Sequence, residues 1–180
     1  MSDKRTGNNW FFGRVYEEAR KDELSFSERA GNVLGIFANL LFLWFFITHQ
    51  RSSTGFFTPR FGQTEMFLFY APILLDIVKT AAKAVVGRKN MIRPFDVAHM
   101  GLSFIEVVWM YMVFPFEFSH LADVLPVFLQ FLLGWISNNI ARVLMIVTMI
   151  ATSISTVYNA ILYVLVREEI RSLNVKFTRS

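Results

Sequence analysis

Residues 66–116 read MFLFYAPILLDIVKTAAKAVVGRKNMIRPFDVAHMGLSFIEVVWMYMVFPF, and this stretch decides the fold. It divides into two apolar segments, 66–86 and 97–116, joined by a short basic turn at 87–94. A connection this short makes consecutive helices antiparallel neighbours. Polar residues near the middle of each segment are therefore expected to lie at a similar level and to face one another.

Four ionisable residues interrupt the two apolar segments: Asp76, Lys79 and Lys83 in the first and Glu106 in the second. At the centre of a membrane helix an Asp or Lys costs roughly 2.5–3.5 kcal/mol, whereas a Leu or Phe returns only roughly 0.3–0.6 kcal/mol. Residues 76, 79 and 83 share one face of a helix. We therefore expect these charges to face protein or a wet cavity and not lipid.

The composition excludes an ordinary soluble domain. Of 180 residues, 54% are hydrophobic, 18% are charged and 20 are Phe. The apolar residues are concentrated in runs at 30–48, 66–86, 97–116 and 143–166, each about 30 Å long as a helix, which is the thickness of a hydrocarbon core. The sequence thus predicts an all-α integral membrane protein built as a four-helix bundle. The absence of cysteine excludes disulfides, thiolate metal sites and cysteine nucleophiles.

The N-terminal region, 1–29, is predicted to be a cytoplasmic tail that carries an amphipathic helix over 10–23. Such a helix is typical of a segment lying on the cytoplasmic leaflet, with a solvated helix that caps the bundle as the alternative. Ser25 and Glu28 form a capping-box pattern, so the first spanning helix is expected to begin just after Ser25. Gly31 and Gly35 form a GxxxG pattern, which favours close helix packing.

The distribution of basic residues predicts the topology. With four spans and a cytoplasmic N-terminus, most of the 18 Lys and Arg residues lie on the cytoplasmic side. A fifth span at 122–140 makes the distribution more even, so 121–140 is interpreted as an external interfacial or re-entrant segment. Both termini, including the basic tail 167–180, are expected in the cytoplasm. The protein is predicted to be a multi-pass protein of the cell membrane.

The polar residues inside the spans are the strongest candidate site. In addition to the four charges, His99 and Ser103 share one face of the third span with Glu106, and small polar residues line the fourth span. The candidate set for an intramembrane polar site or ion relay is Asp76, Lys79, Lys83, His99, Ser103, Glu106, Thr148, Thr152, Ser155 and Asn159. A structural ion-pair network that fixes the register of two helices is the alternative to a relay.

A second, weaker candidate lies on the predicted outer side. The ExxH motif at 117–120 pairs a carboxylate with an imidazole, but a di-iron bundle needs that motif twice. The possible metal ligands are His49, Glu117, His120 and Asp123. Nothing identifies a cofactor, and no catalytic motif is present, so the sequence leaves open whether the chain is an enzyme.

Two functions follow from these patterns. The first is a helix-packing protein, acting as a subunit or scaffold of a membrane complex or as a small homo-oligomer. The alternative is a small ion or proton channel or transporter component that uses Asp76, Lys79 and Glu106. A metal or redox site at the outer face is a third hypothesis. The expected partners are other membrane helices and a bilayer with anionic lipid at the cytoplasmic face; nucleic acid is not indicated, because the basic residues flank the spans.

Overall fold

The computed structural model describes residues 13, 15, 17 and 23–178, and this part of the chain is helical without strands. The elements, in chain order, are α2 (Phe26–Arg51), α3 (Gln63–Val86), α4 (Lys89–Val113), the 3-10 helices η2 (Phe118–His120) and η3 (Val127–Leu132), and α5 (Asn138–Thr178). The all-α prediction is confirmed.

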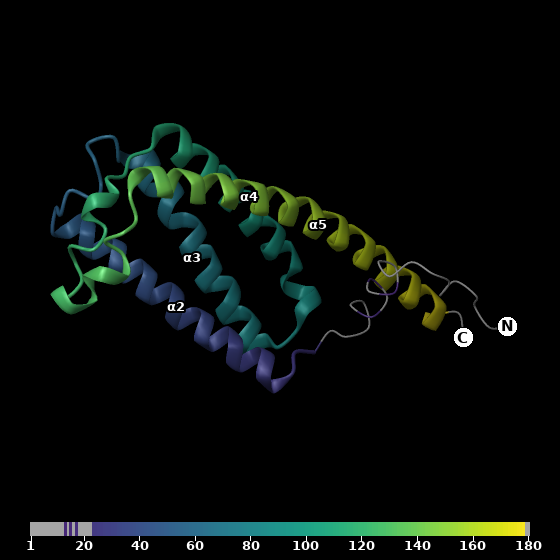
Figure 1. The fold of residues 1–180 in the computed structure, drawn as a ribbon. Coiled ribbons are helices and arrows are strands. Elements are labelled where there is room, and N and C mark those ends of the chain that lie inside the picture. The colour runs from purple at the N-terminus through teal and green to yellow at the C-terminus, as the bar shows by residue number, and fades with distance from the viewer. Residues whose placement is uncertain (1–12, 14, 16, 18–22, 179–180) are drawn as a thin grey trace.

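The extensive interfaces between the helices join neighbours in the chain. α2 packs on α3, α3 on α4 and α4 on α5 (Figure 1). The helices come together at the end that carries the α2–α3 and α4–α5 connections, and α5 extends beyond the other three at the opposite end. This arrangement leaves α2 and α5 as the outer helices, so each of them has a long face that no other helix among the described residues covers extensively.

The predicted start of the first long helix is confirmed. Ser25 is the N-cap of α2, and its backbone N–H donates to Oε2 of Glu28 at 2.8 Å, which completes a capping box. One glycine of the GxxxG pattern is used for packing inside the chain. A Cβ atom added to Gly35 would lie 3.6 Å from Cγ2 of Thr80 on α3, whereas one added to Gly31 would meet nothing within 4 Å.

Among the residues that the structure describes, three helices are long and apolar enough to cross a membrane: α2, α4 and the Asn138–Arg171 part of α5. α3 has a comparable length but is not among them. The reason is compositional, since Asp76, Lys79 and Lys83 all fall in the second half of this helix. A fourth span at 66–86 therefore stays a prediction.

The turn predicted at 87–94 is wrong in its length. α3 ends at Val86, its C-cap Gly87 adopts a left-handed conformation with φ of 67°, and α4 already begins at Lys89. Pro94 lies inside α4, where its ring removes one backbone hydrogen bond without ending the helix. At its other end α4 stops at Val113, followed by Phe114 in a left-handed conformation. The helix is thus shifted toward the N-terminus relative to the predicted span 97–116.

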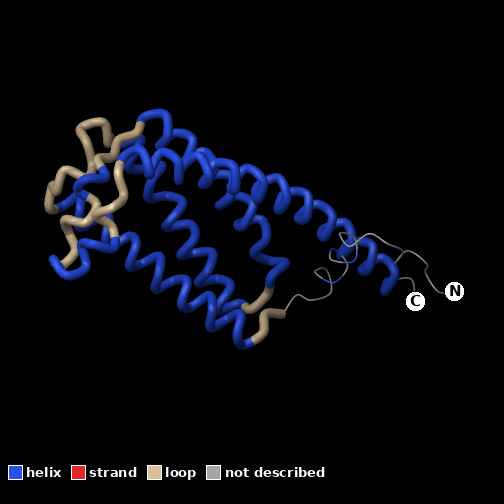
Figure 2. The backbone as a smooth tube through the Cα atoms, viewed as in Figure 1, coloured by secondary structure: helices blue, strands red, loops and turns tan. Residues whose placement is uncertain are grey.

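The longer loops gather at one end of the molecule (Figure 2). A cluster of buried phenylalanine rings holds this loop end together. Phe56, in the α2–α3 loop, is 1% exposed and its ring packs against Phe46, Phe116 and Phe118 at centroid distances of 5.4–5.5 Å. The same loop pairs with the segment after α4, because Glu117 N–H donates to the Phe56 carbonyl at 2.7 Å. We call these two connections and their rings the aromatic cap.

The segment 121–140 contains no long helix before Asn138. It consists of turns and the short η3, followed by the start of α5. Several of its apolar residues are exposed, namely Val127, Phe128, Phe131 and Trp135, whereas Leu121 and Ala122 are buried. This conformation agrees with the prediction that 121–140 is not a fifth span. The location of the segment at a membrane surface remains a prediction.

Glu117 joins the aromatic cap to the start of α5. Its Oε1 accepts hydrogen bonds from Ser119 Oγ at 3.0 Å and from Asn138 Nδ2 at 2.8 Å. These two donors favour the ionised carboxylate and lower the pKa of Glu117 below its ordinary value. Asn138 also accepts from the Phe118 N–H at 2.8 Å, so this one amide orients the chain on both sides of η2.

The amphipathic helix predicted over 10–23 lies mostly outside the described residues. Of the described positions, Gly13, Val15 and Glu17 are helical. Val15 is buried in a small apolar cluster with Leu162 and Val166 of α5. Val15 therefore contacts the half of α5 that extends beyond the other helices.

Candidate functional site

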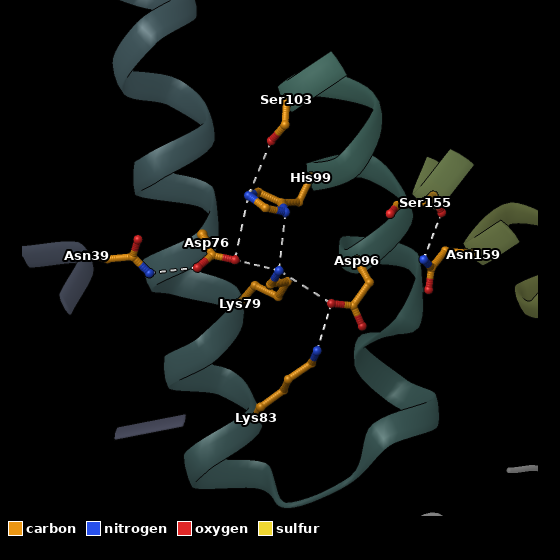
Figure 3. A network of polar contacts seen from close by, with 9 residues as sticks. All are labelled: Asn39, Asp76, Lys79, Lys83, Asp96, His99, Ser103, Ser155 and Asn159. Carbon is orange, nitrogen blue, oxygen red and sulfur yellow. Dashed lines mark hydrogen bonds and ion pairs between the residues drawn. The ribbon is translucent and has the colours of Figure 1, made fainter. Parts of the chain in front are cut away.

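A network of polar side chains links α2, α3 and α4 at mid-length (Figure 3). We call it the polar network, and it consists of Asn39 from α2, Asp76, Lys79 and Lys83 from α3, and Asp96, His99 and Ser103 from α4. The helical spacing explains why these residues share faces: positions 76, 79 and 83 recur on α3, and 96, 99 and 103 on α4. The antiparallel packing of α3 on α4 brings the two faces together.

Lys79 is the centre of the network and is only 8% exposed. Its Nζ lies 2.5 Å from Oδ1 of Asp76 on the previous turn and 3.5 Å from Oδ1 of Asp96 on α4. The other oxygen of Asp76 accepts a hydrogen bond from Nδ2 of Asn39 at 2.7 Å. The Lys79 ammonium group therefore faces two carboxylates, those of Asp76 and Asp96, and the Asn39 amide binds the first of them. These groups come from three different helices.

Asp96 receives a second cation. Lys83 Nζ lies 2.7 Å from the same oxygen, Oδ1, that faces Lys79. The side chains of Lys83 and Asp96 are 23% and 20% exposed, so this pair is nearer to solvent than Lys79. The network thus runs from a buried centre on α3 to a partly exposed end beside the α3–α4 turn.

His99 contacts both members of the central pair. Its Nδ1 lies 3.2 Å from Lys79 Nζ, and its Nε2 lies 3.6 Å from Asp76 Oδ1 and 3.4 Å from Ser103 Oγ. An ammonium group only donates hydrogen bonds, so Nδ1 is assigned as the acceptor and the ring hydrogen to Nε2. In this assignment the neutral imidazole accepts from Lys79 and directs its N–H toward Asp76 and Ser103.

The formal charges of the network cancel, because two carboxylates meet two ammonium groups and a neutral imidazole. The pairs are buried or partly buried, where the loss of one partner leaves an uncompensated charge in a poorly solvated place. A balanced network of this kind specifies which residues of α3 and α4 stand opposite each other. Chemically, it can also pass a proton between carboxylate, imidazole and hydroxyl groups, since those groups are adjacent.

Glu106 lies outside the network. It shares the α4 face of His99 and Ser103, but no hydrogen bond or ion pair connects it to another residue in the described part of the chain. The helix register explains this isolation. Contacts of His99 with Asp76 and of Trp109 with Glu65 bracket Glu106, so it lies opposite residues 66–75 of α3, which include no charged residue.

The small polar residues of α5 also lie apart from the network. Thr148 and Thr152 donate to the carbonyls of Leu144 and Thr148, both at 2.8 Å, in their own helix. Asn159 does the same with the carbonyl of Ser155. A residue that was not among the candidates, Thr156, makes the contact between helices: its hydroxyl donates to the carbonyl of Met100 on α4 at 3.3 Å.

The four possible metal ligands of the predicted outer face do not converge. His49 is buried, with its two ring nitrogens at 2.6 Å from Thr54 Oγ1 and 3.1 Å from the Leu121 carbonyl. His120 Nδ1 lies 2.8 Å from Asp123 Oδ2, and Glu117 is bonded to Ser119 and Asn138. Across the residues that the structure describes, no three His, Asp or Glu side chains form a group that could hold a metal ion.

Two members of the network, Asn39 and Asp96, were not predicted as site residues. Asp96 directly precedes the predicted span 97–116, because Pro94 was interpreted as part of a turn. The sequence does contain a signal for Asp96, because positions 96, 99 and 103 recur at spacings of three and four when α4 is counted as one uninterrupted helix. Asn39 continues the four-residue interval of Gly31 and Gly35, and this pattern indicated a face for close helix packing. In the structure its side-chain amide binds Asp76.

Comparisons with protein-family models, with curated proteins and with solved structures give no match. The function of the polar network and of the helix surfaces is therefore argued from their geometry.

Proposed function

We propose that this chain is a multi-pass membrane protein of four spans, with both termini in the cytoplasm, that acts through helix packing. It serves as a subunit or scaffold of a membrane complex or forms a small homo-oligomer. The charge balance of the polar network supports a structural role for the buried ionisable residues. The uncovered face of α5 supports association with a further helix, in addition to lipid.

One surface of α5 carries this proposal. Seven exposed β-branched residues recur at alternating spacings of four and three along the helix; they are Val143, Val147, Ile150, Ile154, Val157, Ile161 and Val164. We call this row the α5 stripe. Contact with lipid requires apolar side chains but no particular period. A repeat of 3.5 residues is the period at which two helices interlock their side chains over a long interface.

The α5 stripe predicts that thiols placed on it cross-link to a neighbouring helix. Because the chain contains no cysteine, single substitutions are directly informative. In native membranes, Val147→Cys and Ile154→Cys are expected to give cross-linked dimers with a short bifunctional reagent, as measured by gel mobility and mass spectrometry. The matched control is Leu34→Cys on the outer face of α2, since Leu34 and Ile154 are similarly exposed, at 70% and 66%.

A homodimer mass supports the homo-oligomer, and a defined adduct with one other membrane protein supports the subunit or scaffold. Cross-linking at Val147 and Ile154 no greater than at Leu34 would contradict the proposal, because it would mean that lipid covers the α5 stripe as it covers α2.

A proton or ion relay is the second candidate, and the isolation of Glu106 favours it. A carboxyl group inside a membrane helix is costly and is by default a functional candidate. Glu106 lies one turn from Ser103, which contacts His99, so proton-carrying groups recur along the α4 face from Asp96 to Glu106, although no hydrogen bond joins Ser103 to Glu106.

The relay predicts proton or cation flux in vesicles that contain the purified protein, with loss of that flux in both Asp76→Asn and Glu106→Gln. Flux is measured with a pH-sensitive dye in the vesicle lumen after an imposed gradient, and empty vesicles are the control. Wild-type vesicles that are no more permeable than empty ones would remove this candidate.

A further inference from the structure

A short segment at the loop end, residues 124–136 around η3, exposes a group of large apolar side chains. Five of them are between 49% and 84% exposed: Val127, Phe128, Phe131, Leu132 and Trp135. We call residues 124–136 the η3 segment, and we propose that it is a shallow anchor whose exposed side chains lie among the acyl chains of the outer leaflet. The proposal rests on the membrane topology proposed above and extends it, because it gives this segment a lipid partner and a depth.

The η3 segment is attached to the bundle by its inner side. Leu133 and Ile136 pack against the same buried cluster that contains Phe56. Leu121, just before the segment, is buried in that cluster, and its carbonyl lies 3.1 Å from Nε2 of His49 at the end of α2 (Figure 1). The exposed side chains therefore belong to a segment that is packed on the fold and begins beside a candidate span.

The polar groups of the η3 segment are bonded within the segment. Gln130 and Trp135 are its only side chains with hydrogen-bond donors. Gln130 Nε2 donates to the Leu125 carbonyl at 3.3 Å, and Trp135 Nε1 donates to the Leu132 carbonyl at 2.8 Å. Four backbone N–H groups also donate to carbonyls within the segment at 2.8–3.2 Å; they belong to Leu129, Leu133, Gly134 and Ile136. Internal bonding of this kind is what a polar group needs in hydrocarbon, where water offers no partner.

The same bonding favours lipid over a protein partner. A protein interface carries about one hydrogen bond per 100–200 Å². The five exposed side chains have one polar group among them, the indole N–H of Trp135, and it is already bonded to the Leu132 carbonyl. A protein that covered this face would therefore gain apolar contact from these side chains but no hydrogen bond, and acyl chains supply the same contact.

Charge and length set the depth of the anchor. Residues 124–141 include no charged residue, so nothing in the segment carries the high cost of placing a charge in hydrocarbon. The six residues of η3 span about 12 Å at about 2 Å per residue. This is less than half the thickness of a hydrocarbon core, about 15 Å, so η3 is too short to reach the midplane and return. The segment therefore lies at the depth of an interfacial helix, about 5–10 Å into the boundary between headgroups and acyl chains.

The test measures the depth of spin labels in the full-length protein, in vesicles of phosphatidylcholine and phosphatidylglycerol. The chain contains no cysteine, so Phe128→Cys and Phe131→Cys each accept a single nitroxide label. Electron paramagnetic resonance compares collisions with oxygen, which concentrates in hydrocarbon, and with a nickel chelate, which stays in water. The matched control is Arg60→Cys, at an exposed position of the α2–α3 loop. Phe37→Cys, on the outer face of α2, is the reference inside a span; Phe37 is 65% exposed.

We expect the labels at 128 and 131 to collide more often with oxygen than with the nickel chelate, at a depth of about 5–10 Å. The label at 60 is expected to show the opposite preference. Access of the nickel chelate at 128 and 131 equal to that at 60 would overturn the proposal, because the segment then lies in water. Protection of both positions from both reagents would also overturn it, because protein then covers the segment; dipolar broadening between labels would identify that protein as a second copy.

The reference label separates this outcome from failure of the proposed membrane function. A label at 37 in hydrocarbon, with labels at 128 and 131 in water, removes the anchor and leaves the spans intact. A label at 37 that is also in water would mean that α2 does not span the membrane, and the proposed topology itself would fail. Cross-linking through the α5 stripe is independent of both, since the stripe begins after the η3 segment ends.

Discussion

Replacing Lys79 with methionine is expected to destabilise the protein by about 3 kcal/mol. Methionine retains most of the volume of the lysine stem, so packing changes little, but Asp76 loses its cation. Lys79 is 8% exposed, and the ionised carboxylate of Asp76 is left with the Asn39 amide and the neutral imidazole of His99. The measurement is the free energy of unfolding in detergent, followed by helical circular dichroism.

The matched control is the double variant Asp76→Asn with Lys79→Met, which restores the charge balance and keeps an amide opposite Asn39. It is expected to recover most of the lost stability, because residues that form one ion pair are energetically coupled. If the double variant is at least as unstable as the sum of its single variants, the network does not hold the helices as an ion-pair system. Glu106→Gln, which removes a carboxylate without a partner, is expected to cause no loss.

Replacing Phe56 with alanine is expected to cost about 3–5 kcal/mol, the range for a buried aromatic residue. The ring of Phe56 is 1% exposed and packs against residues of α2, its own loop and the segment after α4. Its removal leaves a cavity at the point where the aromatic cap joins the two loops. The same unfolding measurement in detergent tests this prediction.

Phe128→Ala on η3 is the matched control, since the side chain of Phe128 is 74% exposed. A surface substitution of this kind changes the stability by no more than about 0.5 kcal/mol in detergent. A loss at Phe128 as large as that at Phe56 would mean that the exposed rings of the 121–140 segment also support the fold, and that the aromatic cap is not its stabilising centre.

The start of α2 and the grouping of the central charges could be predicted because both depend on local spacing. Ser25 and Glu28 form a capping box whose geometry involves only one turn of helix. Asp76, Lys79 and His99 were expected to face one another because a short connection forces α3 and α4 to be antiparallel. No tertiary information beyond that connection was needed.

Other features depended on the register of one helix against another. Glu106 was grouped with Asp76 and Lys79 by depth, but it stands opposite an apolar part of α3, and only the pairing of the two helices reveals this. The threonines of α5 form a polar row in the sequence, yet their hydroxyls bond to carbonyls one turn earlier in the same helix. A Ser or Thr side chain has this local option in any helix, so spacing alone does not show which neighbour it binds.

Proline also limited the sequence interpretation. Pro94 indicated a helix boundary, since the residue before a proline is biased away from helical conformation. In the structure α4 continues through Pro94, and this continuation places Asp96 on a regular helix one turn from His99. The error at Pro94 and the omission of Asp96 from the site therefore have the same cause.

The length of α5 has a mechanical consequence. Its 41 residues span about 60 Å, roughly twice the thickness of a hydrocarbon core. A continuous rod of that length acts as a lever: a change in inclination of about 20°, equal in size to the average tilt of a membrane helix, displaces its far tip by about 20 Å. Val15 contacts α5 along this outer arm, at Leu162 and Val166, so a swing of the rod displaces the surface against which Val15 packs.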